Sequence, residues 1–407
     1  MRSHAILLVV GLALAACTGP APAQVRPGIT VLLADSAHLI KGKRLGLLSN
    51  QTGSDSAGRR DVDLLMAAGY KLTALFSPEH GFRGAEDRPG LPDTRDSASG
   101  LPIYSLYGGK RAARGQALDS VDVLLVDLQD IGARYYTYPA SATQLLREAA
   151  RRKLRLIVLD RPDPIGGVAV QGNVRATVGD PDSAFVGFLP VPMRHGLTLG
   201  ELLRMSDDLL GLHADLVVVP AAGWHRADYY DATGLPWIKP SPNMPDLESA
   251  THYPGTCLFE GTNLSVGRGT PFAFQVVGAP WLDPAAVLRH LRAHPADLAG
   301  VSADSIAFAP LHPTDGKYDG VTLRGVRLRV TDRATYDPAR TAVALLAAIR
   351  AAHPDSFQFR DESFDRLAAG HELRQALLAG KSATSIAGGW TPALARFRRV
   401  RAKYLLY

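Results

Sequence analysis

The chain has 407 residues, enough for two ordinary domains of about 150 residues each. Hydrophobic residues make up 46% of it and charged residues 21%, a composition that excludes disordered, collagen-like and disulfide-scaffold proteins. The 45 Lys and Arg residues against 39 Asp and Glu residues leave a formal net charge of +6. An excess this small, spread along the chain, does not indicate a nucleic-acid-binding protein.

The first residues have the pattern of an export signal. Arg2 supplies a positive charge, and the apolar run from Ala5 to Ala16 is too short to span a bilayer. The run ends in Leu-Ala-Ala-Cys at Cys17, which resembles a bacterial lipoprotein box. An unprocessed Cys17 in an ordinary secretion signal is the alternative. Because the next residue is Thr rather than Asp, the resemblance to Gram-negative lipoproteins favours the outer membrane. We therefore expect residues 1–23 to be a leader and linker, and the protein to be periplasmic, with a lipid anchor as its membrane contact.

Short apolar runs then alternate with helical patterns, which is typical of βαβ units and a parallel sheet. The expected strands are Arg44–Leu48, Lys71–Phe76, Val121–Leu128, Leu154–Leu159 and Asp215–Pro220. The expected helices are Arg60–Ala68, Ser141–Arg152 and Leu199–Leu210. Thr198 and Glu201 have the spacing of a capping box at the start of the third helix.

A long stretch without periodicity, Ala221–Thr270, is rich in Pro, Gly, Asn and Trp and is interpreted as a binding surface. Beyond it, helices are expected at Pro284–His294, Thr341–His353 and Asp361–Ala379, and a strand at Gly320–Thr331. We therefore predict an α/β fold with a parallel-sheet catalytic domain over residues 24–250. A smaller α/β domain is predicted over residues 251–407.

Ligands of parallel α/β sheets bind outside the carboxyl ends of the strands, so the residues after each apolar run are informative. Four successive strand ends carry amides, carboxylates, guanidinium groups and phenols, which suits a polar, hydroxyl-rich ligand. These residues include Asn50, Gln51, Glu79, His80, Asp130, Arg134, Tyr135, Asp160 and Arg161. For each one taken alone, a structural role as a cap, turn or core residue stays open.

Several familiar chemistries lack their motifs. No P-loop and no Gly-x-Gly-x-x-Gly follows the first strand, and no Gly-x-Ser-x-Gly elbow is present. Nucleotide binding and serine-esterase chemistry therefore have no support. No cysteine cluster accompanies the histidines, and no metal site is predicted. An acyl-transfer or amidase enzyme with Cys257 as nucleophile stays open, although its apolar surroundings favour a buried, inert thiol.

Paired carboxylates remain as candidates. Glu79 follows a strand end, and Pro78 stiffens the turn that presents it. Glu260 ends an apolar run just before a glycine. Two carboxylates that face each other across a cleft are what glycoside hydrolysis requires. The alternative for Glu260 is a structural ion pair with the nearby Arg268.

Several long motifs, in the right order, resemble those of the bacterial exo-β-N-acetylmuramidases over about residues 29–407. They are Ser77–Gly84, Asp127–Tyr138, Ser241–Pro245, Tyr253–Thr256, Phe259–Asn263, Gly267–Phe272 and Arg401–Tyr407. The resemblance implies a Rossmann-like domain, a smaller C-terminal domain and an active site in the cleft between them. It further implies release of terminal N-acetylmuramic acid from the non-reducing end of peptidoglycan fragments, without a metal or organic cofactor.

Under this interpretation Glu79 is the general acid and Glu260 is the second carboxylate. Asp127 is the candidate for the second carboxylate if Glu260 does not fill that role. Arg134 or Arg161 is expected to bind the lactyl carboxylate that distinguishes muramic acid from glucosamine. The other predicted substrate-binding residues are Asn50, Gln51, His80, Tyr135, Asn243 and Asn263. Retaining, inverting and substrate-assisted routes stay open. A non-catalytic periplasmic lipoprotein that binds muropeptides is the alternative function.

Overall fold

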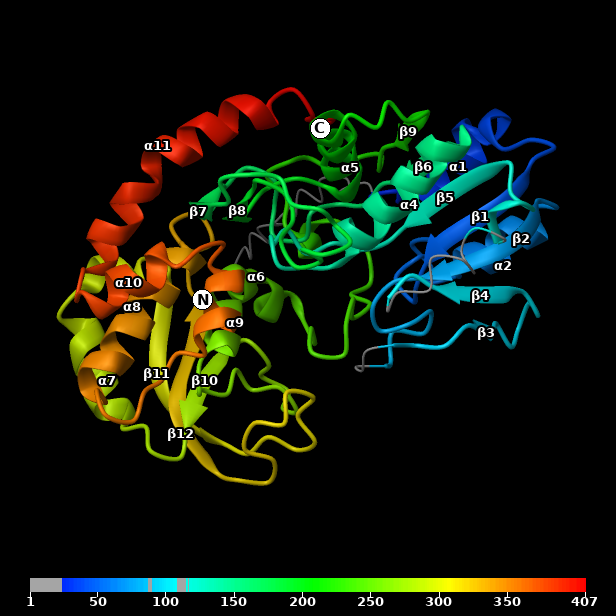
Figure 1. Ribbon diagram of the computed structural model, residues 1–407. Coiled ribbons are helices and arrows are strands. Elements are labelled where there is room, and N and C mark those ends of the chain that lie inside the picture. Colours follow the sequence, from blue (N-terminus) through cyan, green and yellow to red (C-terminus); the bar gives the residue numbers. More distant parts are fainter. Residues whose placement is uncertain (1–23, 87–89, 108–114, 116) are drawn as a thin grey trace, which may run out of the picture.

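The computed structural model describes residues 24–86, 90–107, 115 and 117–407 (Figure 1). The predicted leader, with Cys17, lies outside the described residues. The chain folds into two α/β domains that lie side by side, and helix α11 (Ala383–Arg401) arches from the second domain back to the first. In the described part of the chain, no helix is long and apolar enough to cross a membrane.

A seven-stranded sheet forms the centre of the N-terminal domain. Across the sheet, the strands are β3 (Thr94–Arg95), β4 (Pro102–Ser105), β2 (Lys71–Ser77), β1 (Arg44–Ser49), β5 (Val123–Asp127), β6 (Arg155–Leu159) and β9 (Leu216–Val219). All neighbours are parallel except the edge strand β3. In chain order, the six parallel strands lie 3-2-1-4-5-6, which is the Rossmann order. The predicted fold class and all five predicted strands are confirmed.

Helices cover both faces of this sheet, which is why its strands are continuous apolar runs. They are α1 (Gly28–Asp35), α2 (Asp61–Ala67), α4 (Tyr138–Arg152) and α5 (Leu199–Leu210). Side chains alternate between the faces along each strand: Leu47 packs with α1 and α2, and Leu48 with α4 and α5. The predicted capping box is present, since Thr198 accepts from the Glu201 amide and the Glu201 side chain accepts from the Thr198 amide.

The C-terminal domain contains an antiparallel sheet of three strands, β10 (Val276–Ala279), β12 (Leu323–Val330) and β11 (Val301–Phe308). Its helices are α6 (Leu247–Thr256), α7 (Pro284–Arg292), α8 (Pro338–Ala352), α9 (Asp361–Leu367) and α10 (Glu372–Leu378). The single helix predicted over Asp361–Ala379 was wrong. The left-handed conformation of Ala369 (φ 58°) ends α9, and α10 starts three residues later.

Two connections join the domains. The chain enters the C-terminal domain at α6, inside the stretch predicted to be irregular, and it returns through α11 (Figure 1). At the end of this return the Arg401 Nη1 donates to the Gly167 carbonyl (2.9 Å), and the Tyr407 hydroxyl donates to Asp160 Oδ2 (2.9 Å). A hairpin of β7 (Gln171–Val174) and β8 (Pro192–Arg194) lies under the arch, where β7 contacts α11.

Candidate active site

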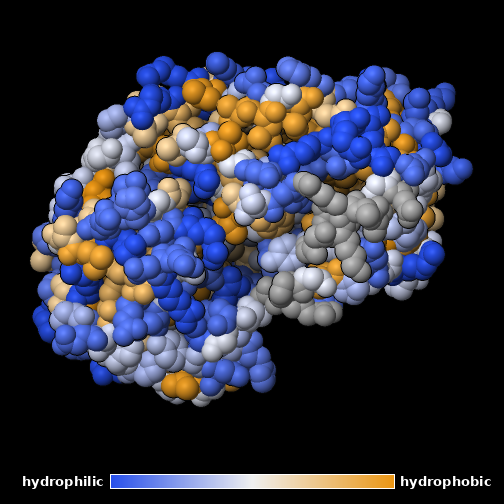
Figure 2. All heavy atoms as spheres, in the orientation of Figure 1, coloured by the Kyte–Doolittle hydropathy of each residue, from blue (hydrophilic) through white to orange (hydrophobic). Residues whose placement is uncertain are grey.

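The loops after β2 and β5 meet the C-terminal domain where the strand order reverses, between β1 and β5. A cavity of about 80 Å³ lies there. It is lined by Glu79, His80, Tyr135, Tyr136, Thr137, Ser241, Asn243, Tyr253, Arg268 and Phe274. Figure 2 shows the recess between the two domains from one side. Ligand pockets are usually about 300–1,000 Å³, so this cavity encloses one sugar ring at most.

Glu79 is half-buried and stands two residues beyond the end of β2. The Thr137 hydroxyl, just before α4, donates to Glu79 Oε2 at 2.5 Å. This hydrogen bond joins the loop after β2 to the loop after β5 and fixes the orientation of the carboxyl group. The following residue, His80, has a left-handed backbone (φ 69°), and its Nδ1 lies 2.8 Å from the Glu86 carbonyl oxygen. Both predicted residues therefore lie in the cavity.

Four aromatic side chains form one wall of the cavity. The Tyr253 ring packs edge-on against Tyr135, Tyr136 and Phe274, with ring centres 6.1, 6.1 and 4.6 Å apart. Burial raises the pKa of all three tyrosines, so their phenols stay protonated at neutral pH. The Tyr135 hydroxyl donates to the Pro254 carbonyl at 3.1 Å, so this hydroxyl is already engaged by the protein. Such a wall suits the apolar face of a sugar ring.

Arg268 brings a positive charge into the cavity from the C-terminal domain. Its Nε donates to Glu260 Oε1 at 2.5 Å, and its guanidinium carbon lies 5.2 Å from the centre of the Phe274 ring. Gly267 (φ 78°) and Gly269 (φ 75°) flank it in the left-handed conformation, and a Cβ at Gly269 would lie 2.5 Å from the Leu311 carbonyl oxygen. Arg268 was predicted as a structural partner for Glu260, and it lies in the Gly267–Phe272 motif, but it was not predicted to bind substrate. The two glycines beside it were the available signal.

Glu260 does not line the cavity itself. It lies in the short helix Cys257–Gly261, directly behind Arg268, and the structure shows the ion pair given above as the structural alternative. Its other oxygen, Oε2, lies 3.6 Å from Cys257 Sγ. Cys257 is buried, and burial raises the pKa of its thiol well above the usual range, which leaves no thiolate for nucleophilic attack.

Replacing Glu260 by Gln separates the two roles. A carboxylate that acts on the sugar should cost about 10²–10⁴-fold in kcat when removed. If Glu260 only orients Arg268, the substitution should instead raise KM by about 3–10-fold and change kcat less. The hydrogen bond to the charged Arg268 is then weakened, while the general acid Glu79 remains in place. We expect the second result in steady-state kinetics. A loss of kcat comparable to that of a Glu79 variant would restore Glu260 as a catalytic residue.

Asp127 and Arg161 form a buried ion pair outside this cavity. Asp127 was predicted as an alternative to Glu260, and Arg161 as a possible ligand of the lactyl carboxylate. Arg161 binds both oxygens of Asp127, with 3.0 Å from Nη2 to Oδ2, and donates to the Ser54 carbonyl at 2.7 Å. Asp61 lies beside them, and burial raises its pKa well above the ordinary value. The pair therefore joins β5, β6 and the loop after β1, and neither residue lines the Glu79 cavity.

Arg134, the other predicted ligand of the lactyl carboxylate, also binds protein groups. Its Nη1 donates to the Asn173 carbonyl (2.6 Å) and its Nη2 to the Leu367 carbonyl (2.8 Å), so it links the β7 hairpin to α9. Three predicted amide side chains are similarly engaged. Asn50 Nδ2 donates to the Tyr138 hydroxyl (2.9 Å), Gln51 Nε2 to the Lys239 carbonyl (2.7 Å) and Asn263 Nδ2 to the Ser356 carbonyl (2.8 Å). Of the predicted residues, the cavity thus contains Glu79, His80, Tyr135 and Asn243.

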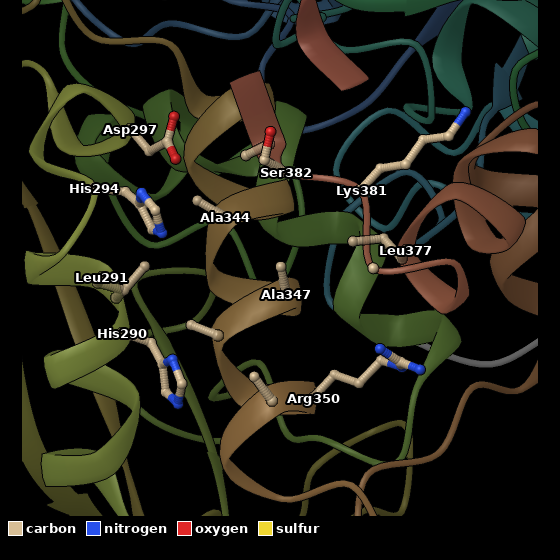
Figure 3. Close-up of a pocket in the computed structure, with 14 residues that line it drawn as sticks. His290, Leu291, His294, Asp297, Ala344, Ala347, Arg350, Leu377, Lys381 and Ser382 are labelled. Carbon is tan, nitrogen blue, oxygen red and sulfur yellow. The ribbon is translucent and has the colours of Figure 1, made fainter. Parts of the chain in front are cut away.

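A larger cavity, of about 250 Å³, lies within the C-terminal domain between α7, α8 and the turn before α11 (Figure 3). Alanines of α8 form its floor, and His290, His294, Arg350 and Lys381 surround it. Its one carboxylate, Asp297, is paired with Arg340 at 2.7 Å. Although His290 and His294 are four residues apart, no group of three or more His, Cys, Asp or Glu side chains in the described part of the chain is placed to hold a metal ion. This cavity contains none of the predicted site residues.

A glutamate and an aromatic wall lie in a cavity between a Rossmann-ordered sheet and a second α/β domain, an arrangement that suits a two-domain glycosidase. Residues 45–248 match the family model described as exo-beta-N-acetylmuramidase NamZ, N-terminal, and residues 251–407 match its C-terminal counterpart. The chain belongs to the exo-β-N-acetylmuramidase NamZ family, and the resemblance seen in its motifs is confirmed.

Relatives and solved structures agree with this assignment. The peptidoglycan beta-N-acetylmuramidase NamZ of Bacillus subtilis (strain 168) is 38% identical over 388 residues, which is 94% of this chain and 92% of that protein. Two crystal structures of DUF1343 family proteins from Bacteroides fragilis are similar in fold. One has a TM-score of 0.84 at 33% identity and the other 0.75 at 31%, each over 94% of this chain and 99% of theirs.

Proposed function

We propose that this enzyme is an exo-acting glycosidase that releases terminal N-acetylmuramic acid from the non-reducing end of peptidoglycan fragments. The observation that carries the proposal is the Glu79 carboxyl group, held by Thr137 in a cavity that an arginine and an aromatic wall complete. Membership of the NamZ family and the name of the Bacillus relative support the same substrate. A cavity of about 80 Å³ is too small for several sugar rings, which suits cleavage at a chain end.

In this proposal Glu79 is the general acid. It gives its proton to the glycosidic oxygen as the bond from that oxygen to the anomeric carbon breaks, and a water molecule completes the hydrolysis. The Thr137 hydroxyl donates to Oε2, which leaves Oε1 as the oxygen for proton transfer to the sugar. The sugar ring packs against Tyr253 and its neighbours, while His80, Ser241 and Asn243 offer hydrogen-bonding groups to its substituents.

The direct test uses a disaccharide with N-acetylmuramic acid at its non-reducing end. We expect the enzyme to release free N-acetylmuramic acid, detected by mass spectrometry, and to leave a disaccharide with N-acetylglucosamine at that end intact. Binding of the first disaccharide without release would instead support the alternative of a non-catalytic muropeptide-binding lipoprotein.

We also propose that the protein is exported to the periplasm and anchored to the outer membrane through Cys17, with no nucleic-acid partner. The apolar run before Cys17 and the lipoprotein-like box support this location. Cells given labelled palmitate should incorporate the label into the wild-type protein and not into Cys17→Ser, whose membrane-bound fraction should become soluble. Equal labelling of both proteins would exclude lipidation at this residue.

A further inference from the structure

We propose that Arg268 binds the lactyl carboxylate on O3 of the terminal sugar and thereby selects N-acetylmuramic acid over N-acetylglucosamine. The inference rests on the proposed function, because the lactyl group belongs to that substrate. The two sugars differ in charge at this position, so the residue that distinguishes them should offer a cation inside the cavity that holds the ring.

Arg268 meets this requirement where the two predicted arginines do not. Arg134 and Arg161 donate to carbonyl oxygens and to Asp127, outside the Glu79 cavity. Arg268 is the one guanidinium group among the described residues that line the cavity. Its side chain is 18% exposed, so an ion pair formed there is partly shielded from water and salt.

The surroundings of Arg268 determine how it can bind a carboxylate. Its Nε edge is held by Glu260 at 2.5 Å, and Glu260 lies outside the lining of the cavity. Its Nη1 lies 3.5 Å from Thr314 Oγ1, which in turn lies 3.4 Å from Asn243 Nδ2. Arg268 and Asn243 both line the cavity, and a planar guanidinium group matches the two oxygens of a carboxylate.

Three features keep the guanidinium group in this position. Glu260 binds one edge, the Phe274 ring packs under it at 5.2 Å, and the glycines on either side fix the turn that carries it. Less side-chain entropy is then lost when a ligand binds. Glu260 is a positioning residue in this arrangement, because it binds Arg268 and does not line the cavity.

The test compares the aryl glycosides of N-acetylmuramic acid and N-acetylglucosamine with the wild type and with Arg268→Gln. We expect KM for the muramyl glycoside to rise about 10–100-fold in the variant, since a charge-assisted bidentate contact is lost. The kcat value should change less, and neither protein should cleave the glucosaminyl glycoside appreciably. Arg268→Lys keeps the positive charge without the planar guanidinium group, so its KM for the muramyl glycoside should lie between those of the wild type and Arg268→Gln.

The matched control is Arg327→Gln in β12, an arginine that stacks on Phe272 in the same domain but lies outside the cavity. It should keep the preference for the muramyl glycoside.

Calorimetric titration with free N-acetylmuramic acid and free N-acetylglucosamine gives a readout that needs no catalysis. Wild-type protein that binds N-acetylmuramic acid more tightly but hydrolyses neither glycoside would overturn the proposed function and leave the role of Arg268 in lactyl binding supported. If the melting curve shows that the Arg268→Gln protein is folded, and it still prefers N-acetylmuramic acid as the wild type does, then Arg268 does not bind the lactyl group.

Discussion

Replacing Glu79 by Gln should lower kcat for the muramic-acid-terminated disaccharide by about 10²–10⁴-fold and leave KM within a few-fold of wild type. The amide has the shape of the carboxyl group, and its oxygen can still accept the hydrogen bond from Thr137. The variant therefore keeps the geometry of the cavity and loses only the proton that the leaving oxygen needs. Initial rates of N-acetylmuramic acid release measure the effect.

The leaving group makes this test specific for acid catalysis. An aryl glycoside with an acidic phenol departs with little protonation, so Glu79→Gln should lose much less activity on it than on the disaccharide. A residue that only binds sugar would lose the same factor on both substrates. Glu148→Gln is the matched control, because Glu148 is a glutamate of α4 that pairs with Arg151 at the surface. Equal losses on the two substrates would assign the acid to another residue.

Replacing Arg161 by Met should destabilise the folded enzyme by about 3–5 kcal/mol at neutral pH, because it leaves the buried Asp127 without its cation. Burial raises the pKa of Asp127 and of Asp61 above 3.8, and the charge of Arg161 opposes that rise. Without Arg161 both carboxyl groups should retain their protons when folded. Urea denaturation of the variant and the wild type measures the difference.

The pH dependence of this loss follows from the same groups. In the unfolded chain the two carboxyls ionise near pH 4, while in the folded variant they do so only at much higher pH. The pKa of Asp61 is already raised well above its ordinary value in the wild type, so Asp127 dominates the difference between the two proteins. The loss should therefore be smallest near pH 4 and grow by up to about 1.4 kcal/mol per pH unit above it. Arg44→Met, which breaks the surface pair with Asp122, should change the stability far less than Arg161→Met, because water screens an exposed pair. A folded Arg161 variant that has lost its preference for the muramyl substrate would show that Arg161 binds the lactyl group.

Local patterns in the sequence predicted the N-terminal sheet well, because each parallel strand is a continuous apolar run covered on both faces. Strand β11 was not predicted, since Ser, Asp and Ala interrupt its apolar residues on the exposed side of an edge strand. The break between α9 and α10 was missed for a different reason. Ala369 adopts a positive φ that its side chain does not favour, and the surrounding contacts impose it.

The candidate site was predicted where it depends on strand ends and missed where it depends on the docking of the second domain. Glu79, His80 and Tyr135 follow β2 and β5 directly, so the topology alone brings them together. Arg268 reaches the cavity from a turn far along the chain, and no local signal shows where such a turn will dock. Asn50 has the right chemistry at the right strand end, but Tyr138 and Thr52 use its amide.

The return of α11 to the N-terminal domain limits how the cavity can open. The chain passes between the domains once at α6 and once at the end of α11, where Arg401 and Tyr407 are held by hydrogen bonds. Arg134 and Gln171 of the N-terminal domain also donate to the Leu367 and Tyr336 carbonyls of the C-terminal domain, so the domains are joined at more places than the two chain crossings. A movement of the whole domains that widened the cavity would therefore have to break several of these hydrogen bonds together.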